Sequence, residues 1–231
     1  MYNLGEFEKC KPLYKKFIAE SGNKQLENYS SYSLAFCHYN LNEFKIALES
    51  FEKRYLSKHS SSGDKEDSLF RISKILYNLE RYDNAILRIR AFIKKFPKSQ
   101  LLSDLYIIAG KIYLKKKNYY RAIANFNIVI KNYSKTSNAG EAAFLKGSAY
   151  YLDDHFKSAI KTFESAIIKW PESSFKSKSM FFLAECLFNL KKYSTALEKY
   201  KNIIKEYPDS KFSKPASAAI SEIYKIQKSL P

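Results

Sequence analysis

The chain has 231 residues, of which 40 are Lys or Arg and 23 are Asp or Glu, so its formal net charge is +17. Apolar residues make up 45% and aromatic residues 16%, which is too much apolar surface for a disordered polyelectrolyte, so the chain must bury a core. Six Gly and six Pro leave little room for a turn-rich β-sandwich or barrel.

A five-residue motif that ends in a small residue recurs through the whole chain, as EFEKC, EFKIA, RYDNA, NYYRA, HFKSA and KYSTA. The small residues, which we call the alanine positions, are 37, 38, 37, 37 and 37 residues apart; they are Cys10, Ala47, Ala85, Ala122, Ala159 and Ala196. A second marker lies twelve residues after three of them, at Pro97, Pro171 and Pro208, and Ser134 takes the same place in one segment. This constant spacing predicts a repeat protein.

Each repeat is predicted to be a pair of helices. Apolar residues recur at helical spacing, for example at Leu69, Ile72 and Leu76, and a proline cannot continue a helix, so the prolines mark helix ends. Ser99, Ser173 and Ser210 stand at N-cap distance from the next apolar run. In chain order we expect a lone second helix in 1–22, five helix pairs in 23–62, 63–98, 99–135, 136–172 and 173–209, and a capping helix in 210–231.

Three features of the repeat resemble the tetratricopeptide repeat. These are a small residue twelve before the alanine position, an aromatic residue four after it, with Ile89 departing, and the proline twelve after it. The small residues are Ala35, Ser73, Gly110, Gly147 and Ala184, and the aromatic ones Phe51, Phe126, Phe163 and Tyr200. The resemblance implies an all-α, right-handed α-solenoid that forms a single domain over 1–231, in which neighbouring helix pairs stack.

The period is longer than the usual tetratricopeptide period of about 34 residues. A 37-residue period with YPxS junctions resembles bacterial envelope members of the family, namely the coordinator of the Tol-Pal system and the lipoprotein subunit of the outer-membrane β-barrel assembly machinery. That resemblance implies a role in cell-envelope assembly or maintenance.

The first twenty residues parallel 77–93, a second helix, so we expect that the chain begins inside a longer protein with a further helix and a targeting signal upstream. The protein would then be periplasmic or envelope-associated, and otherwise cytoplasmic. No stretch reaches the roughly 18 to 20 apolar residues of a membrane span.

No residues with catalytic or metal-binding spacing are found. Cys10, Cys37 and Cys186 fall at apolar core positions and form no CxxC pair, and the three histidines have no second ligand at helical spacing. Motifs of hydrolases, phosphate-binding loops and zinc proteases are absent. We therefore expect no enzyme activity, no cofactor, no metal and no small-molecule substrate.

The resemblance implies that the first helix of each pair lines a concave groove, where a peptide or protein partner would bind. The residues at the equivalent repeat positions of each first helix form two aromatic-rich stripes with polar or charged positions between them. The predicted groove residues are Tyr32, Phe36, Tyr39, Phe70, Lys74, Tyr77, Ile107, Lys111, Leu114, Phe144, Ser148, Tyr151, Phe181, Glu185 and Phe188. The aromatic residues could instead simply pack against neighbouring helices.

Charge is concentrated in residues 84–140, which hold twelve bases and one acid, Asp104, and so +11 of the +17. Besides Lys111, the bases of this basic segment are Arg88, Arg90, Lys94, Lys95, Lys98, Lys115, Lys116, Lys117, Arg121, Lys131 and Lys135. An acidic protein, an anionic lipid surface or a nucleic-acid backbone could bind there. A compositional bias toward Lys, Asn, Ile, Tyr and Phe is the alternative explanation of the charge as a whole. Only six of the 40 bases are Arg, which is a weak signal for specific nucleic-acid recognition.

Overall fold

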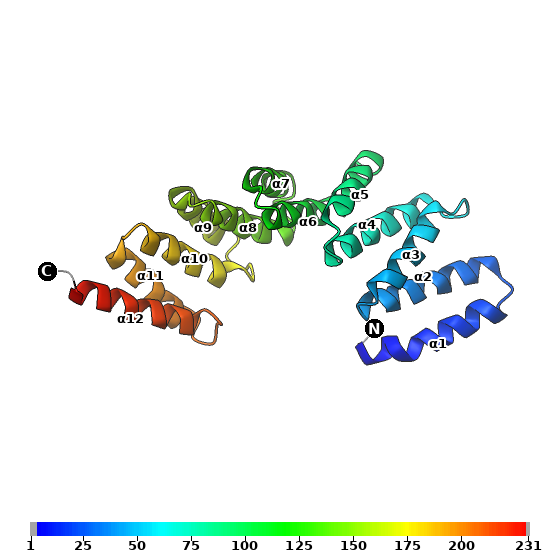
Figure 1. Cartoon of the computed structure of the whole chain (residues 1–231), viewed down its shortest axis with the longest axis horizontal. Coiled ribbons are helices and arrows are strands. Elements are labelled where there is room, and N and C mark those ends of the chain that lie inside the picture. The colour runs from blue at the N-terminus through cyan, green and yellow to red at the C-terminus, as the bar shows by residue number, and fades with distance from the viewer. Residues whose placement is uncertain (1–3, 230–231) are drawn as a thin grey trace. The chain divides into compact units, whose positions relative to one another are not determined.

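The computed structural model describes residues 4–229, and in this range the chain forms twelve helices and no strand (Figure 1). It divides into two compact parts, an N-terminal part that ends at Ile108 and a C-terminal part that begins at Ala109. The N-terminal part holds α1 (Leu4–Glu20), α2 (Lys24–Asn40), α3 (Phe44–Leu56), α4 (Ser62–Asn78) and α5 (Tyr82–Lys95). The division falls within α6 (Leu102–Lys115), and the C-terminal part continues with α7 (Tyr119–Asn132), α8 (Asn138–Leu152), α9 (Phe156–Lys169), α10 (Lys176–Asn189), α11 (Tyr193–Glu206) and α12 (Ser213–Ser229). The predicted all-α fold is confirmed, whereas the assignment of helices to seven repeat segments stays a prediction.

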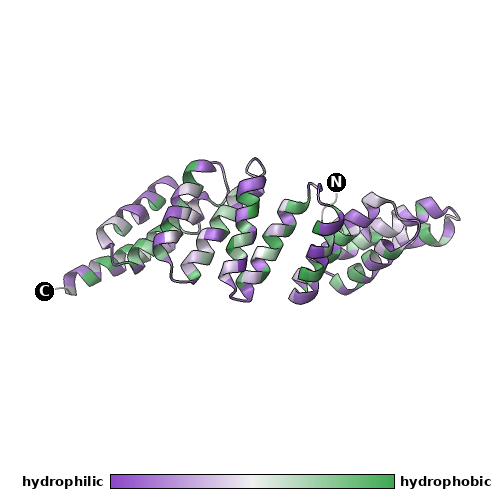
Figure 2. Cartoon of the chain, turned by 90° about the horizontal axis from the view of Figure 1, so that it is seen from above, coloured by the Kyte–Doolittle hydropathy of each residue, from purple (hydrophilic) through white to green (hydrophobic). Residues whose placement is uncertain are grey.

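Consecutive helices pack against each other within each part. In the N-terminal part α1 contacts α2, α2 contacts α3, α3 contacts α4 and α4 contacts α5. In the C-terminal part the same succession runs from α7 to α12, and α10 also contacts α8. Figure 2 shows hydrophobic and hydrophilic residues alternating along the helices, which is the pattern of amphipathic helices that each bury one stripe.

The alanine positions and the positions four residues later form the centre of each helix pair. Five alanine positions, all except Cys10, are completely buried. The side chains four residues after these five are also buried; they are Phe51, Ile89, Phe126, Phe163 and Tyr200. Alanine at the first position lets the second helix approach its neighbours, and the large side chain one turn later fills the space between them.

The size of the residue at the small position of the first helix is limited by its contact with that large side chain. A Cβ atom on Gly147 would overlap the ring of Phe163, and one on Gly110 would overlap the ring of Phe126. In these two helix pairs glycine is therefore required by the closeness of the helices and not by a special backbone angle.

The turn inside each helix pair contains one residue whose backbone is in the left-handed conformation. Within residues 4–229, five residues that are not glycine have φ between 54° and 60°, namely Asn42, Glu80, Lys117, Asp154 and Lys191. The amide that follows each of them donates to a carbonyl five residues earlier, as from Arg81 to Leu76 at 2.9 Å. This is the hydrogen bond of a Schellman cap, which normally favours glycine at the left-handed position.

The junction serines do not act as the N-caps that the sequence predicted. Ser99 Oγ accepts a hydrogen bond from the amide of Leu101 at 3.0 Å, and Ser173 and Ser210 do the same with Phe175 and Phe212. Since α6, α10 and α12 begin one residue after these amides, the serines stabilise the turn that precedes each helix.

The spacing of 38 residues between the alanine positions Ala47 and Ala85 coincides with an irregular connection before α4. Arg54 takes the place that is apolar in the other second helices, and its guanidinium donates to Asp64 Oδ1 at 2.5 Å and to the Asn28 carbonyl at 3.0 Å. Ser61 and Asp64 form a capping box at the start of α4. Arg54 thereby ties the start of α4 to α2 and α3.

Replacing Gly147 with Leu should lower the free energy of unfolding by about 1–3 kcal/mol or more, because the new side chain must displace the buried Phe163 ring. Urea unfolding followed by circular dichroism measures this. Gly63→Leu is the matched control, since a Cβ on Gly63 meets only the Ser61 hydroxyl at 3.9 Å. Equal stability losses in the two variants would contradict the close-contact explanation.

Candidate functional site

The predicted groove residues differ in accessibility. Phe70, Ile107 and Phe144 have exposed fractions of 6%, 4% and 3% and belong to the core. Their side chains cannot serve as accessible anchors for a partner, so for these three the packing alternative holds. The other twelve are half-buried, and each of these presents part of its side chain to solvent.

In the N-terminal part, Arg71 lies among the aromatic residues of the predicted groove. Its guanidinium carbon is 5.0 Å from the ring centre of Phe36, 5.9 Å from that of Tyr39 and 6.0 Å from that of Phe70. The Arg71 Nε donates to Asp67 at 3.3 Å. The guanidinium thus covers part of the half-buried Phe36 and Tyr39 rings.

In the C-terminal part, Phe182 takes the same place in the repeat as Arg71. Its ring centre is 5.8 Å from that of Phe144 and 5.4 Å from that of Tyr151. Both residues stand two before the small position of the first helix and reach back to the preceding first helix. Sequence reasoning missed this position, although large side chains recur there, at Arg71, Ile108, Leu145 and Phe182.

Two further lysines and one carboxylate lie near Lys178 in the C-terminal part. Lys111 Nζ bonds Glu141 Oε1 at 2.6 Å, and Lys178 Nζ lies 4.5 Å above the centre of the Phe144 ring. Burial and the charge of Lys211 lower the pKa of Lys178. Lys178 and Lys211 were not among the predicted groove residues. Their cluster with Lys111, which we call the lysine cluster, has more positive charge than Glu141 can neutralise.

One carboxylate, that of Glu185, interacts with two tyrosines elsewhere in the C-terminal part. The hydroxyl of the buried Tyr200 donates to Glu185 Oε1 at 2.5 Å. Burial, followed by this hydrogen bond, raises the pKa of Tyr200, and burial together with the Glu185 charge raises the pKa of Tyr151. Glu185 therefore already has a hydrogen-bonding partner in the protein, the Tyr200 hydroxyl, although its own side chain is half-exposed.

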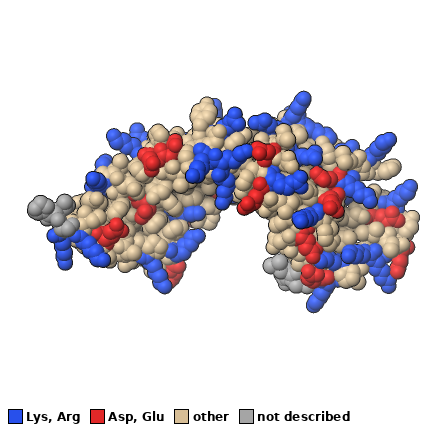
Figure 3. Space-filling view, in the orientation of Figure 1, with Lys and Arg blue, Asp and Glu red and all other residues tan. Residues whose placement is uncertain are grey.

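The basic segment is largely accessible. Of its eleven bases other than Lys111, ten are exposed and Arg88 is half-buried, with Arg88 Nη2 bonding Glu52 at 3.3 Å. Five of the eleven lie in the N-terminal part and six in the C-terminal part. Figure 3 shows basic side chains over the visible faces of both parts, with acidic ones between them.

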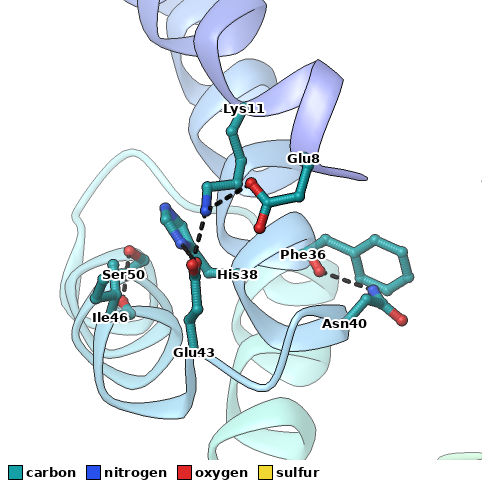
Figure 4. A network of polar contacts seen from close by, with 8 residues as sticks. All are labelled: Glu8, Lys11, Phe36, His38, Asn40, Glu43, Ile46 and Ser50. Atoms are coloured by element: carbon teal, nitrogen blue, oxygen red, sulfur yellow. Dashed lines mark hydrogen bonds and ion pairs between the residues drawn. The ribbon is translucent and has the colours of Figure 1, made fainter. Parts of the chain in front are cut away.

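A polar network joins α1, α2 and α3 (Figure 4). Glu43 accepts from Lys11 Nζ at 2.7 Å and contacts the ring nitrogen Nδ1 of the buried His38, while Lys11 also reaches Glu8 at 3.4 Å. A histidine with a carboxylate could act as a general base, yet its contacts here tie three helices together. The hydrogen bond from Lys11, followed by that from His38, lowers the pKa of Glu43.

The cysteines have the environments of structural residues. Cys37 and Cys186 are buried, as predicted, whereas Cys10 is half-buried. Burial raises the pKa of the Cys186 thiol to about 12 and also raises that of Cys37, so neither thiol is activated. Among the residues that the structure describes, no three His, Cys, Asp or Glu side chains are grouped as a metal would need.

Two hollows lie largely outside the predicted groove. One is lined by α9, α10 and α11, including Ile167, Met180 and Leu183, and the other by α1, α2 and α3 with the connection after α3, including Lys53 and Arg54. Of their lining residues only Tyr32 belongs to the predicted groove. No helix in residues 4–229 has the length and apolar character needed to cross a membrane.

Models of the tetratricopeptide repeat match residues 67–99, 109–174 and 178–210, which together are more than half of the chain. The chain belongs to the tetratricopeptide repeat family. The matched ranges contain α7 to α9 entire and the close contacts of Gly110 and Gly147 described above.

Several solved structures share the fold at low sequence identity. The C-terminal part of a repeat-containing protein from Cytophaga hutchinsonii has a TM-score of 0.76 at 19% identity, covering 97% of this chain and 85% of that one. The apo form of RapI has a TM-score of 0.71 at 16% identity, covering 88% and 84%. MamA from Desulfovibrio magneticus RS-1 has a TM-score of 0.64 at 19% identity, covering 79% and 97%. A search of curated proteins finds no match to this tetratricopeptide chain.

The lowered pKa of Glu43 predicts a pH-dependent contribution to stability. Because Glu43 has a lower pKa when folded, its pairing stabilises the protein at pH values above the ordinary carboxyl pKa of 4.5 and is lost as the pH falls through the lowered value. Denaturant unfolding from pH 7 to pH 3 should show a smaller acid-induced loss in Glu43→Gln than in wild type. Glu49→Gln, an exposed change in α3, which Glu43 directly precedes, is the control and should follow wild type. Parallel curves for Glu43→Gln and wild type would contradict the role of the network.

Proposed function

We propose that this tetratricopeptide protein is a non-catalytic scaffold that binds a peptide or protein partner along its first helices. The observation that carries the proposal is the lysine cluster of Lys111, Lys178 and Lys211 beside the half-buried rings of Phe175 and Phe212. Apolar anchors give a partner affinity, while an excess of positive charge orients it.

The lysine cluster favours an acidic group on the partner. Lys178 is half-buried over Phe144, and the charges near it are those of two lysines and Glu141, so positive charge exceeds negative charge around it. An acidic side chain or a terminal carboxylate of the partner would relieve this repulsion. The half-exposed rings of Tyr151, Phe181 and Phe188 offer apolar contacts on the same helices.

The pathway is the more specific part of the proposal. The 37-residue period and the YPxS junctions support a role in cell-envelope assembly or maintenance, with the protein in the periplasm or associated with the envelope. The repeat family and the absence of catalytic motifs from the sequence support a scaffold rather than an enzyme.

The groove is tested with peptides selected from a random displayed library on the immobilised wild-type protein. The double variant Lys178→Glu, Lys211→Glu should lower the affinity of the selected peptides by at least about tenfold, because it reverses the charge next to the aromatic rings. Isothermal titration calorimetry measures the affinities.

The charge-matched control is Lys161→Glu, Lys201→Glu, which changes two exposed lysines of the second helices α9 and α11. It should bind the selected peptides as wild type does. If both double variants bind equally well, or if the library yields no binding peptide, the proposed groove is wrong.

A second candidate function is binding of nucleic acid or another anionic surface through residues 84–140, and the exposure of ten basic side chains there favours it. Such binding should weaken steeply between about 50 and 200 mM salt, since it releases counterions. Fluorescence anisotropy with a labelled DNA duplex measures it, and Lys115→Glu, Lys116→Glu, Lys117→Glu should reduce the salt slope. Affinity that is absent at low salt or insensitive to salt would exclude nucleic acid as the ligand.

A further inference from the structure

Lys178, in α10, stands at a repeat position that is acidic in three other first helices. This position lies eighteen residues before the alanine position. Its equivalents in α2, α4, α6 and α8 are Tyr29, Asp67, Asp104 and Glu141. The stacking of the helices is therefore compatible with an acid, a base or a neutral side chain here, and the base is a feature of α10 among these five helices.

Lys211, which precedes α12, also departs from the repeat. It stands fifteen residues after the alanine position, and the equivalent residues after α3, α5, α7 and α9 are uncharged, namely Ser62, Gln100, Ser137 and Ser174. After burial, the charge of Lys211 is the next cause of the lowered pKa of Lys178. Two bases that the repeat does not require therefore lie near each other.

These two lysines lack the kind of partner that Lys111 has. Glu141 bonds Lys111 at 2.6 Å, and the Glu141 side chain is 22% exposed. One unit further on, the residues at the same two repeat positions are Ser148 and Lys178, and the Ser148 hydroxyl donates to a carbonyl of its own helix at 3.0 Å. Among the residues that the structure describes, Lys178 and Lys211 form no ion pair, and their ammonium groups lie over aromatic rings.

The lysine cluster has more positive charge than one carboxylate from a partner would neutralise. Three ammonium groups and Glu141 leave two positive charges in excess, and partial burial weakens their screening by solvent. A phosphomonoester carries between about 1.5 and 2 negative charges at pH 7, together with three strong acceptor oxygens. Lysine binds phosphate as a point charge, without the planar geometry that arginine requires. The charge of the cluster therefore matches one phosphomonoester.

We propose that the lysine cluster recognises a phosphorylated side chain of the peptide or protein partner. This inference rests on the proposed function, because it names the chemical group that the first helices bind. Lys178 Nζ is 6.0 Å from the ring centre of Phe175, and Lys211 Nζ is 5.3 Å from that of Phe212. Both rings are half-buried, so apolar residues next to the phosphate can pack on them, which favours a peptide over phosphate alone.

This site differs from the basic segment, which is the candidate for nucleic acid. Lys178 and Lys211 lie outside residues 84–140. Each phosphodiester of a nucleic acid carries a single negative charge, whereas the cluster has two positive charges in excess. The two sites are therefore tested with different probes and different variants.

The test uses fluorescent synthetic peptide pools in which only the centre is fixed, as phosphoserine, as two glutamates or as serine, while the flanking residues are degenerate. Retention on the immobilised full chain measures binding. Wild type should retain the phosphoserine pool at least about tenfold better than the serine pool, as expected of charge-assisted hydrogen bonds, and better than the two-glutamate pool. The double variant Lys178→Gln, Lys211→Gln should lose this preference.

Glu141→Gln should act in the opposite direction. It removes the carboxylate that competes with the phosphate, so it should raise retention of the phosphoserine pool, an effect that loss of structure cannot imitate. The charge-matched controls are Lys161→Gln, Lys201→Gln for the two lysines and Glu164→Gln for Glu141, all exposed on second helices. These controls should retain the pools as wild type does, and circular dichroism verifies the helix content of every variant.

Equal retention of the phosphoserine pool and either other pool by wild type would overturn the proposal, as would an unchanged preference in the double lysine variant. N-acetyl-O-phosphoserine amide should compete at least about tenfold more weakly than peptides recovered from the phosphoserine pool, because it lacks their apolar contacts. Equal competition would show a site for free phosphate instead. The groove itself is tested with unphosphorylated peptides, so a groove that binds those and ignores phosphate refutes this inference alone.

Discussion

The structure depends on one close contact, between the small residue of a first helix and the large side chain four residues after the alanine position of its second helix. Where the small residue is glycine, as at Gly147, the ring of Phe163 lies so near that a methyl group would overlap it. This distance brings the two helices of a pair together, and buried alanines at positions such as Ala159 let the next pair approach as closely. The sequence is periodic because this contact is repeated in each helix pair along the chain.

The same stacking limits what a partner can reach. The residue two before each small position, such as Arg71 or Phe182, reaches back to the rings of the preceding first helix. Aromatic residues that the sequence places on one face are consequently shared between helix packing and solvent. Phe144 is covered almost completely, while Tyr151 retains some exposed surface. A partner would meet edges of rings and charged groups rather than an open aromatic wall.

Function in such a fold resides in side chains that the repeat does not require. Lys178 and Lys211 occupy positions that packing leaves variable, and their charges outnumber the neighbouring carboxylate. This departure from the repeat can be seen only by comparing a residue with its equivalents in the other units.

The sequence by itself determined the helical fold, the phase of the repeat and the burial of Cys37 and Cys186, because these follow from the spacing of apolar and small residues along the chain. It also predicted two aromatic-rich stripes on the first helices, though not their exposure. The tertiary structure alone decided that Phe70, Ile107 and Phe144 belong to the core, since their burial depends on neighbouring helices. It also revealed Arg71 and Lys178 as neighbours of the rings, and showed that the junction serines cap turns instead of helices. The physical reason is that periodicity fixes which side of a helix a residue occupies, whereas contacts between side chains of successive pairs depend on their shapes and separations in space.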